Sequence, residues 1–88
     1  MQVYMVERSL PGIPMDQLAA AQQRAISTTK QMSAEGKPVR YVRSTYVPES
    51  GKCMCLFEAE SAELVKAANE KAKIPFDRVV PALDLTPA

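Results

Sequence analysis

The chain has no histidine and no tryptophan. Histidine is the commonest general base near neutral pH and the commonest metal ligand, so its absence removes whole classes of site. Ser-His and Cys-His nucleophilic catalysis are excluded within this chain, as is a haem held by a proximal histidine. The sequence also lacks the Gly-rich loop of Walker-type phosphate sites. The residues therefore specify no reaction, and we expect no bound cofactor.

The chain also has no large excess of positive or negative charge. The sequence has 11 Lys and Arg residues against 10 Asp and Glu residues, for a net charge of +1. Such a chain exerts little overall attraction on nucleic acid or anionic membrane, so we expect no nucleic-acid and no membrane partner. Its longest apolar runs fall far below the roughly 20 residues needed to span a bilayer. Residues 1–8 lack a signal-peptide pattern, which predicts a cytoplasmic protein whose two cysteines stay reduced.

Six regular segments follow one another along the 88 residues, which suffice for one domain, residues 1–88, with a small core. Their periodicities predict a strand, a helix, two strands, a helix and a strand, at 2–7, about 14–35, 39–47, 52–59, about 62–73 and 78–83. This β-α-β-β-α-β order predicts an α+β fold of the ferredoxin-like split βαβ type. In that fold a four-stranded antiparallel sheet carries both helices on one face.

The ends of the predicted helices carry local signals. Pro14 suits the first helical position, which leaves Ile13 as an N-cap without a side-chain acceptor. Gly36 is a typical residue just after a helix end. Ser61 is a good N-cap for the second helix.

The strands at 53–57 and 79–83 are apolar on both faces. A two-faced strand such as 53–57 is typically central, whereas Pro81 in the last strand indicates an edge position or a bulge. A chain of this size has no third layer to cover the sheet face away from the helices. We therefore expect a homodimer through this open face. In a monomer, a helix or the C-terminal tail would have to cover it.

Cys53 and Cys55 stand two residues apart on a predicted strand, so both thiols point to one face. Parallel side chains at this spacing disfavour a disulfide. We expect small buried hydrophobes, with Cys55 unreactive and with no partner for a hydroxyl in its place. The alternative is a soft-metal or redox pair, although a metal would need further ligands.

Arginine and tyrosine supply a second candidate site. Three of each, namely Arg8, Arg40, Arg43, Tyr4, Tyr41 and Tyr46, could form a pocket for an anion or a planar ligand. The alternative is ordinary cross-strand packing and ion pairing. Strict alternation places Val39, Tyr41, Arg43, Thr45 and Val47 on one face of their strand and Arg40, Val42, Ser44 and Tyr46 on the other. Our candidate ligand-binding residues are Tyr4, Tyr41, Arg43 and Cys55, with no metal ligand and no assigned catalytic residue.

Residues 51–61 (Gly-Lys-Cys-Met-Cys-Leu-Phe-Glu-Ala-Glu-Ser), together with 4–12, 65–68 and 74–79, give the chain a family resemblance. It resembles a family of small bacterial domains of unknown function, some described as nickel-binding or nickel-responsive. The resemblance implies a ferredoxin-like fold and a dimer. Metal-binding members carry histidine on both helices, where Gln22, Asn69 and Lys73 stand here, so we expect no tightly held nickel. Cys55 matches a cysteine common in the family.

Three functions from different classes follow. The first is a dimeric domain that binds a small molecule without chemistry. The second is a divergent metal-binding member that uses Cys53, Cys55 and carboxylates. The third is an enzyme of the dimeric α+β-barrel type, oxygenase-like or isomerase-like, with a pocket between sheet and helices.

Overall fold

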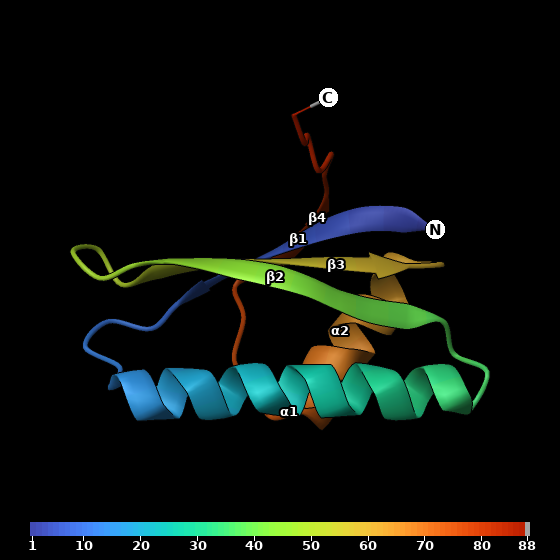
Figure 1. Cartoon of the computed structure of the whole chain (residues 1–88), viewed down its shortest axis with the longest axis horizontal. Coiled ribbons are helices and arrows are strands. Elements are labelled where there is room, and N and C mark those ends of the chain that lie inside the picture. Colours follow the sequence, from blue (N-terminus) through green and yellow to red (C-terminus); the bar gives the residue numbers. More distant parts are fainter. Residues whose placement is uncertain (88) are drawn as a thin grey trace.

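The computed structural model describes residues 1–87, whose arrangement is drawn in Figure 1. Within these residues the elements follow the predicted order: β1 (Gln2–Ser9), α1 (Met15–Ala34), β2 (Val39–Val47), β3 (Lys52–Ala59), α2 (Ala62–Lys71) and β4 (Arg78–Pro81). The ferredoxin-like α+β fold is thus confirmed. The predicted bounds of β2 and β3 are correct, whereas β1 continues to Ser9, and α2 and β4 end earlier than predicted, at Lys71 and Pro81.

The strands form one antiparallel sheet in the order β2-β3-β1-β4. β3 lies between β1 and β2 and pairs with both along its length, which confirms the central place predicted for it. β4 pairs with β1 at the edge, from Tyr4↔Pro81 to Glu7↔Arg78. Pro81 therefore ends an edge strand, where the missing N–H of proline is tolerated.

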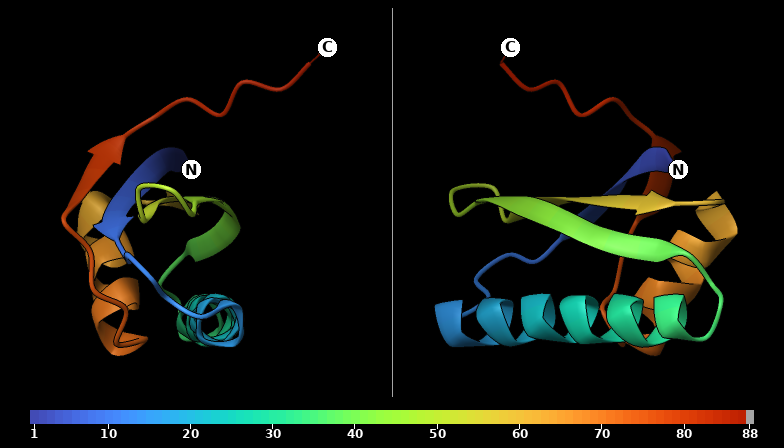
Figure 2. Two further views of the ribbon diagram at one scale, coloured as in Figure 1. Left: turned by 90° about the vertical axis from the view of Figure 1, so that its left-hand side faces the viewer. Right: turned by 45° about the vertical axis from the view of Figure 1, so that its right-hand side comes forward.

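Both helices lie against one face of the sheet, and the core fills the space between (Figures 1 and 2). α1 buries Ala21, Ala25, Thr29 and Met32, a stripe at helical spacing. Its small side chains permit a close approach to the sheet. The largest fully buried side chains come from both layers: Phe57, Val6, Val39, Val65, Asn69 and Cys53.

The ends of α1 differ in how they are capped. The N-cap is Pro14 rather than the predicted Ile13, and it likewise makes no side-chain cap bond. At the C-terminus, the Gly36 amide donates to the Ser33 carbonyl (3.1 Å) and the Lys37 amide donates to the Met32 carbonyl (2.9 Å). This is a Schellman motif, which the positive φ of Gly36, 83°, permits.

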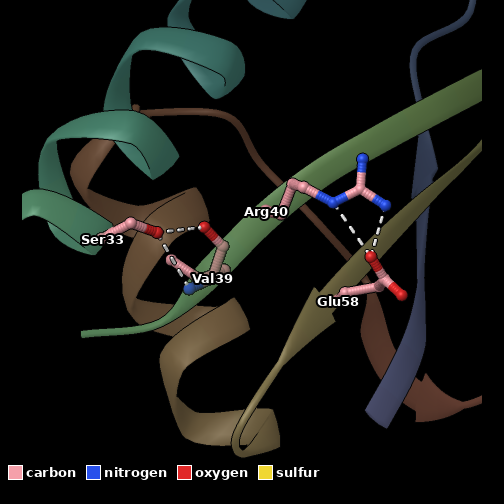
Figure 3. A network of polar contacts seen from close by, with 4 residues as sticks. All are labelled: Ser33, Val39, Arg40 and Glu58. Atoms are coloured by element: carbon pink, nitrogen blue, oxygen red, sulfur yellow. Dashed lines mark hydrogen bonds and ion pairs between the residues drawn. The ribbon is translucent and has the colours of Figure 1, made fainter. Parts of the chain in front are cut away.

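Two serines secure the helices. Ser33 Oγ donates to the Val39 carbonyl (2.7 Å) and accepts from the Val39 amide (3.2 Å), which ties the end of α1 to the start of β2 (Figure 3). Ser61 Oγ accepts a hydrogen bond from the Leu64 amide (3.3 Å), which confirms the predicted N-cap of α2.

Gly51 joins two loops at close range. Its amide donates to the Val47 carbonyl (2.8 Å) in the β2–β3 turn, and its carbonyl accepts from the Leu10 amide (2.7 Å). Its φ is +76°, and a Cβ placed on it would lie 2.5 Å from Pro11 Cα. Only glycine meets both conditions without displacing the backbone.

A β-bulge at Val42 overturns the predicted faces of β2. Tyr41 pairs with Phe57 and Arg43 pairs with Leu56, so Val42 is the extra residue. An extra residue reverses the alternation beyond it. Ser44 and Tyr46 consequently lie opposite the buried Cys55 and Cys53, on the helix side with Val39 and Tyr41. Arg43, Thr45 and Val47 lie on the opposite face, so the prediction that they share a face with Tyr41 is wrong.

The sheet face away from the helices has an apolar centre with charges around it. The half-buried centre consists of Val3, Met5, Met54, Leu56 and Val80. Three ion pairs surround it: Arg40–Glu58 (Figure 3), Arg78–Glu7 and Arg43–Asp84.

The segment after β4 leaves the sheet on the side of this open face and rises away from it (Figure 2). The Ala82 amide donates to the Val3 carbonyl (3.0 Å), and Asp84 reaches Arg43 on β2. Leu83 and Leu85 remain 81% and 85% exposed. Neither helix within residues 1–87 has the length and apolar character needed to cross a membrane.

Candidate functional site: a cavity between the first helix and the sheet

A cavity of about 280 Å³ lies between α1 and the inner face of the sheet. α1 supplies an apolar wall that includes Leu18, Ala21 and Ala25. The opposite wall comes from the strands and carries tyrosine, serine, cysteine and arginine side chains. An apolar cavity with a few polar groups on one wall is the usual form of a small-molecule site.

A chain of hydrogen bonds runs along the polar wall. Gln22 Nε2 on α1 donates to Tyr41 Oη (3.0 Å), and Tyr41 Oη lies 2.6 Å from Ser44 Oγ. Ser44 Oγ in turn donates to Cys55 Sγ (2.8 Å). The Val42 bulge makes this chain possible, because it puts Ser44 on the same face as Tyr41.

The Tyr41 ring is also fixed by packing. It meets the buried Phe57 ring edge to face, with centroids 5.5 Å apart and the planes at 76°. Farther along β2, Tyr46 Oη donates to the Leu10 carbonyl (2.8 Å). Both tyrosines are therefore held in place before any ligand arrives.

Cys53 and Cys55 are free, buried thiols on the inner face, as predicted, with their sulfurs 3.8 Å apart. Burial raises the pKa of the Cys53 thiol to about 11, and the neighbouring Cys55 adds to the shift, while the nearby Arg8 opposes it. Cys53 is therefore a protonated thiol at neutral pH. The expectation that a hydroxyl at position 55 would lack a partner is wrong, because Ser44 Oγ is within reach.

Arg8 is the one charged side chain in the cavity lining within the described residues. It is 3% exposed. Its Nη1 donates to the Pro75 carbonyl (3.2 Å) and its Nη2 donates to Asn69 Oδ1 (2.9 Å). Asn69 is itself fixed, because its Nδ2 donates to the Val65 carbonyl (2.8 Å).

The structure divides the four predicted site residues. Tyr41 and Cys55 line the cavity. Tyr4 is 9% exposed and belongs to the core beside Phe57, outside the cavity lining. Arg43 lies on the other face of the sheet with Asp84.

Sequence reasoning missed Ser44 and Gln22 as lining residues. It grouped Arg8 with the arginines and tyrosines that could form a pocket, but left it out of the four chosen ligand-binding residues. The signal for Arg8 was present, since alternation in the first strand sets it on one face with Tyr4 and Val6. For Ser44 no sequence signal existed, because the bulge alone puts it on the inner face. Arg40, which was grouped with Arg8, pairs with Glu58 on the open face.

A family model described as "Nickel responsive protein SCO4226-like" matches residues 4–81. The chain belongs to this family. Its structure is similar to the crystal structure of SCO4226 from Streptomyces coelicolor A3(2), with a TM-score of 0.80 and 27% sequence identity. That match covers 96% of this chain and 99% of the other. No curated protein matches the sequence.

Membership in the SCO4226-like family confirms the resemblance drawn from the sequence motifs. The three positions that the resemblance aligns with histidines have different surroundings in this structure. Gln22 bonds to Tyr41, Asn69 is buried beneath Arg8, and Lys73 is exposed with a φ of 57°. Neither the family description nor the matched structure names an enzyme, so the comparisons give the enzyme alternative no support.

Proposed function

We propose that this protein is a homodimeric ligand-binding domain of the SCO4226-like family, with its site in the cavity beneath α1 and without a nickel site. The observation that carries the proposal is the cavity itself. It is lined by an apolar helix face and by polar side chains that are already oriented by Phe57 and by one another. A site organised before binding loses little entropy when a ligand is ordered in it.

The donor set does not fit nickel. Imidazole suits nickel(II), whose sites with nitrogen and oxygen donors are typically square-planar or tetragonal. The sequence has no histidine, and within residues 1–87 no group of three or more Cys, Asp or Glu side chains could hold a metal ion. Asn69 Oδ1 already accepts from Arg8. The cysteine pair stands beside a guanidinium, which repels a divalent cation.

The open sheet face supports the dimer. Its apolar centre, Val3, Met5, Met54, Leu56 and Val80, has charged residues at its margin that already pair within the chain. An apolar centre within a polar rim is the usual anatomy of a protein interface. A second copy fits because the face has no net excess of one charge to repel itself, and because the exposed Leu83 and Leu85 gain cover.

Ligand binding is tested by titrating a library of small fragments into isotope-labelled protein while recording amide NMR spectra. Binding in the cavity should shift the amide signals of Ala21, Ser44 and Cys55. Ala21→Leu fills the cavity and should abolish these shifts, whereas Ala67→Leu, at an exposed position on α2, should preserve them. Shifts confined to other surfaces, or no shifts with any fragment, would refute the site.

Dimerisation is tested by light scattering at micromolar concentration. The wild-type protein should have twice the mass of the chain. Leu56→Glu places a charge at the centre of the open face and should give a monomer, while Ala67→Glu adds the same charge on α2 and should not. A monomeric wild-type protein would count against the dimer.

The nickel assignment is tested by equilibrium dialysis of purified protein against nickel(II), followed by elemental analysis. We expect no stoichiometric nickel after dialysis into metal-free buffer. One retained nickel ion per chain would overturn this part of the proposal.

A further inference from the structure

The charge of Arg8 has no counter-charge in the described part of the chain. A guanidinium keeps its positive charge in proteins. Both hydrogen-bond acceptors of Arg8, the Pro75 carbonyl and Asn69 Oδ1, are neutral. The ion pairs found within residues 1–87 join Arg40, Arg43, Lys71 and Arg78 to carboxylates, and none includes Arg8. Buried charges are normally paired, because removal from water is costly without an opposite charge.

The cavity offers no anion of its own. None of its described lining residues is acidic. The Cys53 thiol lies close enough to be influenced by the guanidinium, yet burial raises its pKa to about 11. At neutral pH the cavity therefore has a single positive charge, on Arg8, that nothing in its wall neutralises.

We propose that the cavity binds a small monocarboxylate, with its carboxylate against the Arg8 guanidinium and its apolar body against Leu18, Ala21 and Ala25. This inference rests on the proposed function, because it names the ligand class of the same cavity. Guanidinium and carboxylate form charge-assisted hydrogen bonds, which are roughly twice as strong as neutral ones.

The single charge selects a monoanion. A phosphate dianion would leave negative charge uncompensated in an apolar cavity, at the cost that attends any unpaired buried ion. A carboxylate leaves none. No described lining residue other than Arg8 is basic, so the second charge of a dicarboxylate would also stay uncompensated.

The cavity volume guides the choice of probe ligands. A volume of about 280 Å³ equals roughly nine water molecules at about 30 Å³ each. Phenylacetate and octanoate, each with about ten non-hydrogen atoms, are therefore suitable probes.

Arg8 also has a structural role, since it joins β1 to α2 and to the segment before β4. A purely structural Arg8 would make the cavity indifferent to ligand charge. Charge preference of the ligand is thus the observation that separates the two roles.

The experiment compares phenylacetate with its neutral isostere phenylacetamide on wild-type protein by NMR titration. The acid should bind at least tenfold more tightly than the amide, and its addition alone should shift the Arg8 Nε–Hε signal. In Arg8→Gln the acid and the amide should bind about equally. Arg40→Gln, which removes the same charge from the open face, should leave the preference unchanged.

The outcomes distinguish failure of the carboxylate proposal from failure of the cavity as a binding site. If acid and amide bind the cavity equally, the carboxylate is refuted while the cavity site stands. If neither these probes nor octanoate bind, but neutral fragments do, the carboxylate is likewise refuted and the cavity remains a binding site. If nothing binds, the proposed function fails as well. Should Arg8→Gln not fold, the wild-type acid-to-amide ratio and the Arg8 side-chain signal still decide the question.

Discussion

Replacing Gly51 by alanine should destabilise the protein far more than the same replacement at Gly12. Both glycines have positive φ, 76° and 69°, a conformation that costs a residue with a Cβ about 1–2 kcal/mol. At Gly12 nothing lies within 4 Å of an added Cβ, so this strain is the whole cost. At Gly51 the added Cβ would lie 2.5 Å from Pro11 Cα and 2.8 Å from Pro11 N.

The obstacle at Gly51 is backbone, which a rotamer change cannot remove. The two loops must separate, and the hydrogen bond from the Leu10 amide to the Gly51 carbonyl (2.7 Å) lengthens. Overpacking of this kind typically costs a further 1–3 kcal/mol, roughly. We therefore expect a loss of about 1–2 kcal/mol for Gly12→Ala and about 2–5 kcal/mol for Gly51→Ala.

Urea unfolding followed by circular dichroism measures both losses under identical conditions. Gly36→Ala serves as a second control, since its φ is 83° and nothing lies within 4 Å of its added Cβ. The reasoning would be wrong if Gly51→Ala cost no more than the two controls. That result would mean that the turn does not pack against Pro11 in solution.

The remaining predictions concern the inner face of the sheet. Phe57→Ala should lower the free energy of unfolding by about 3–5 kcal/mol in urea unfolding, because the ring is buried and supports Tyr41. Cys55→Ser should cost only about 1 kcal/mol in the same assay, since Ser44 Oγ can pair with the new hydroxyl, and a loss as large as that of Phe57→Ala would contradict this. Because burial raises the pKa of the Cys53 thiol from 9.0 to about 11, proton binding by this thiol favours the folded state. This contribution to the free energy of unfolding is fully present below pH 9 and should be lost as the pH rises through 11. Cys53→Ala should remove this alkaline decline in unfolding titrations, and an unchanged decline would refute the assignment.

The order of elements and most of their bounds follow from local sequence. Alternation set the strands, and small residues at helical spacing set the buried face of α1. Ser61 bonds to the amide three residues on, a contact that its own neighbours fully determine. Such interactions span a few residues, so they can be predicted without knowledge of the rest of the chain.

The ends of elements were less accurate for the same reason. β1 continues to Ser9 because Ser9 pairs with Lys52, a partner supplied by a distant strand. Helix α2 ends at Lys71 rather than at residue 73. Residue 73 has a positive φ, and the Ile74 amide donates to the Asn69 carbonyl (3.0 Å).

The candidate site was predicted only in part. Sequence reasoning selected Tyr41 and Cys55, which line the cavity, and also Tyr4 and Arg43, which do not. The error at Arg43 has one cause, the bulge at Val42, because an extra residue exchanges the faces of every position beyond it.

By itself, the sequence determined the fold class, the exclusion of histidine chemistry and the common face of Arg8, Tyr4 and Val6. These depend on composition and on short-range periodicity. The tertiary structure alone decided that this face is buried, that Ser44 turns towards Cys55, and that Arg8 lies in a cavity with neutral partners. Burial, register and the absence of a counter-charge arise from residues that are distant in the chain, such as Arg8 and Pro75, which stand 67 positions apart.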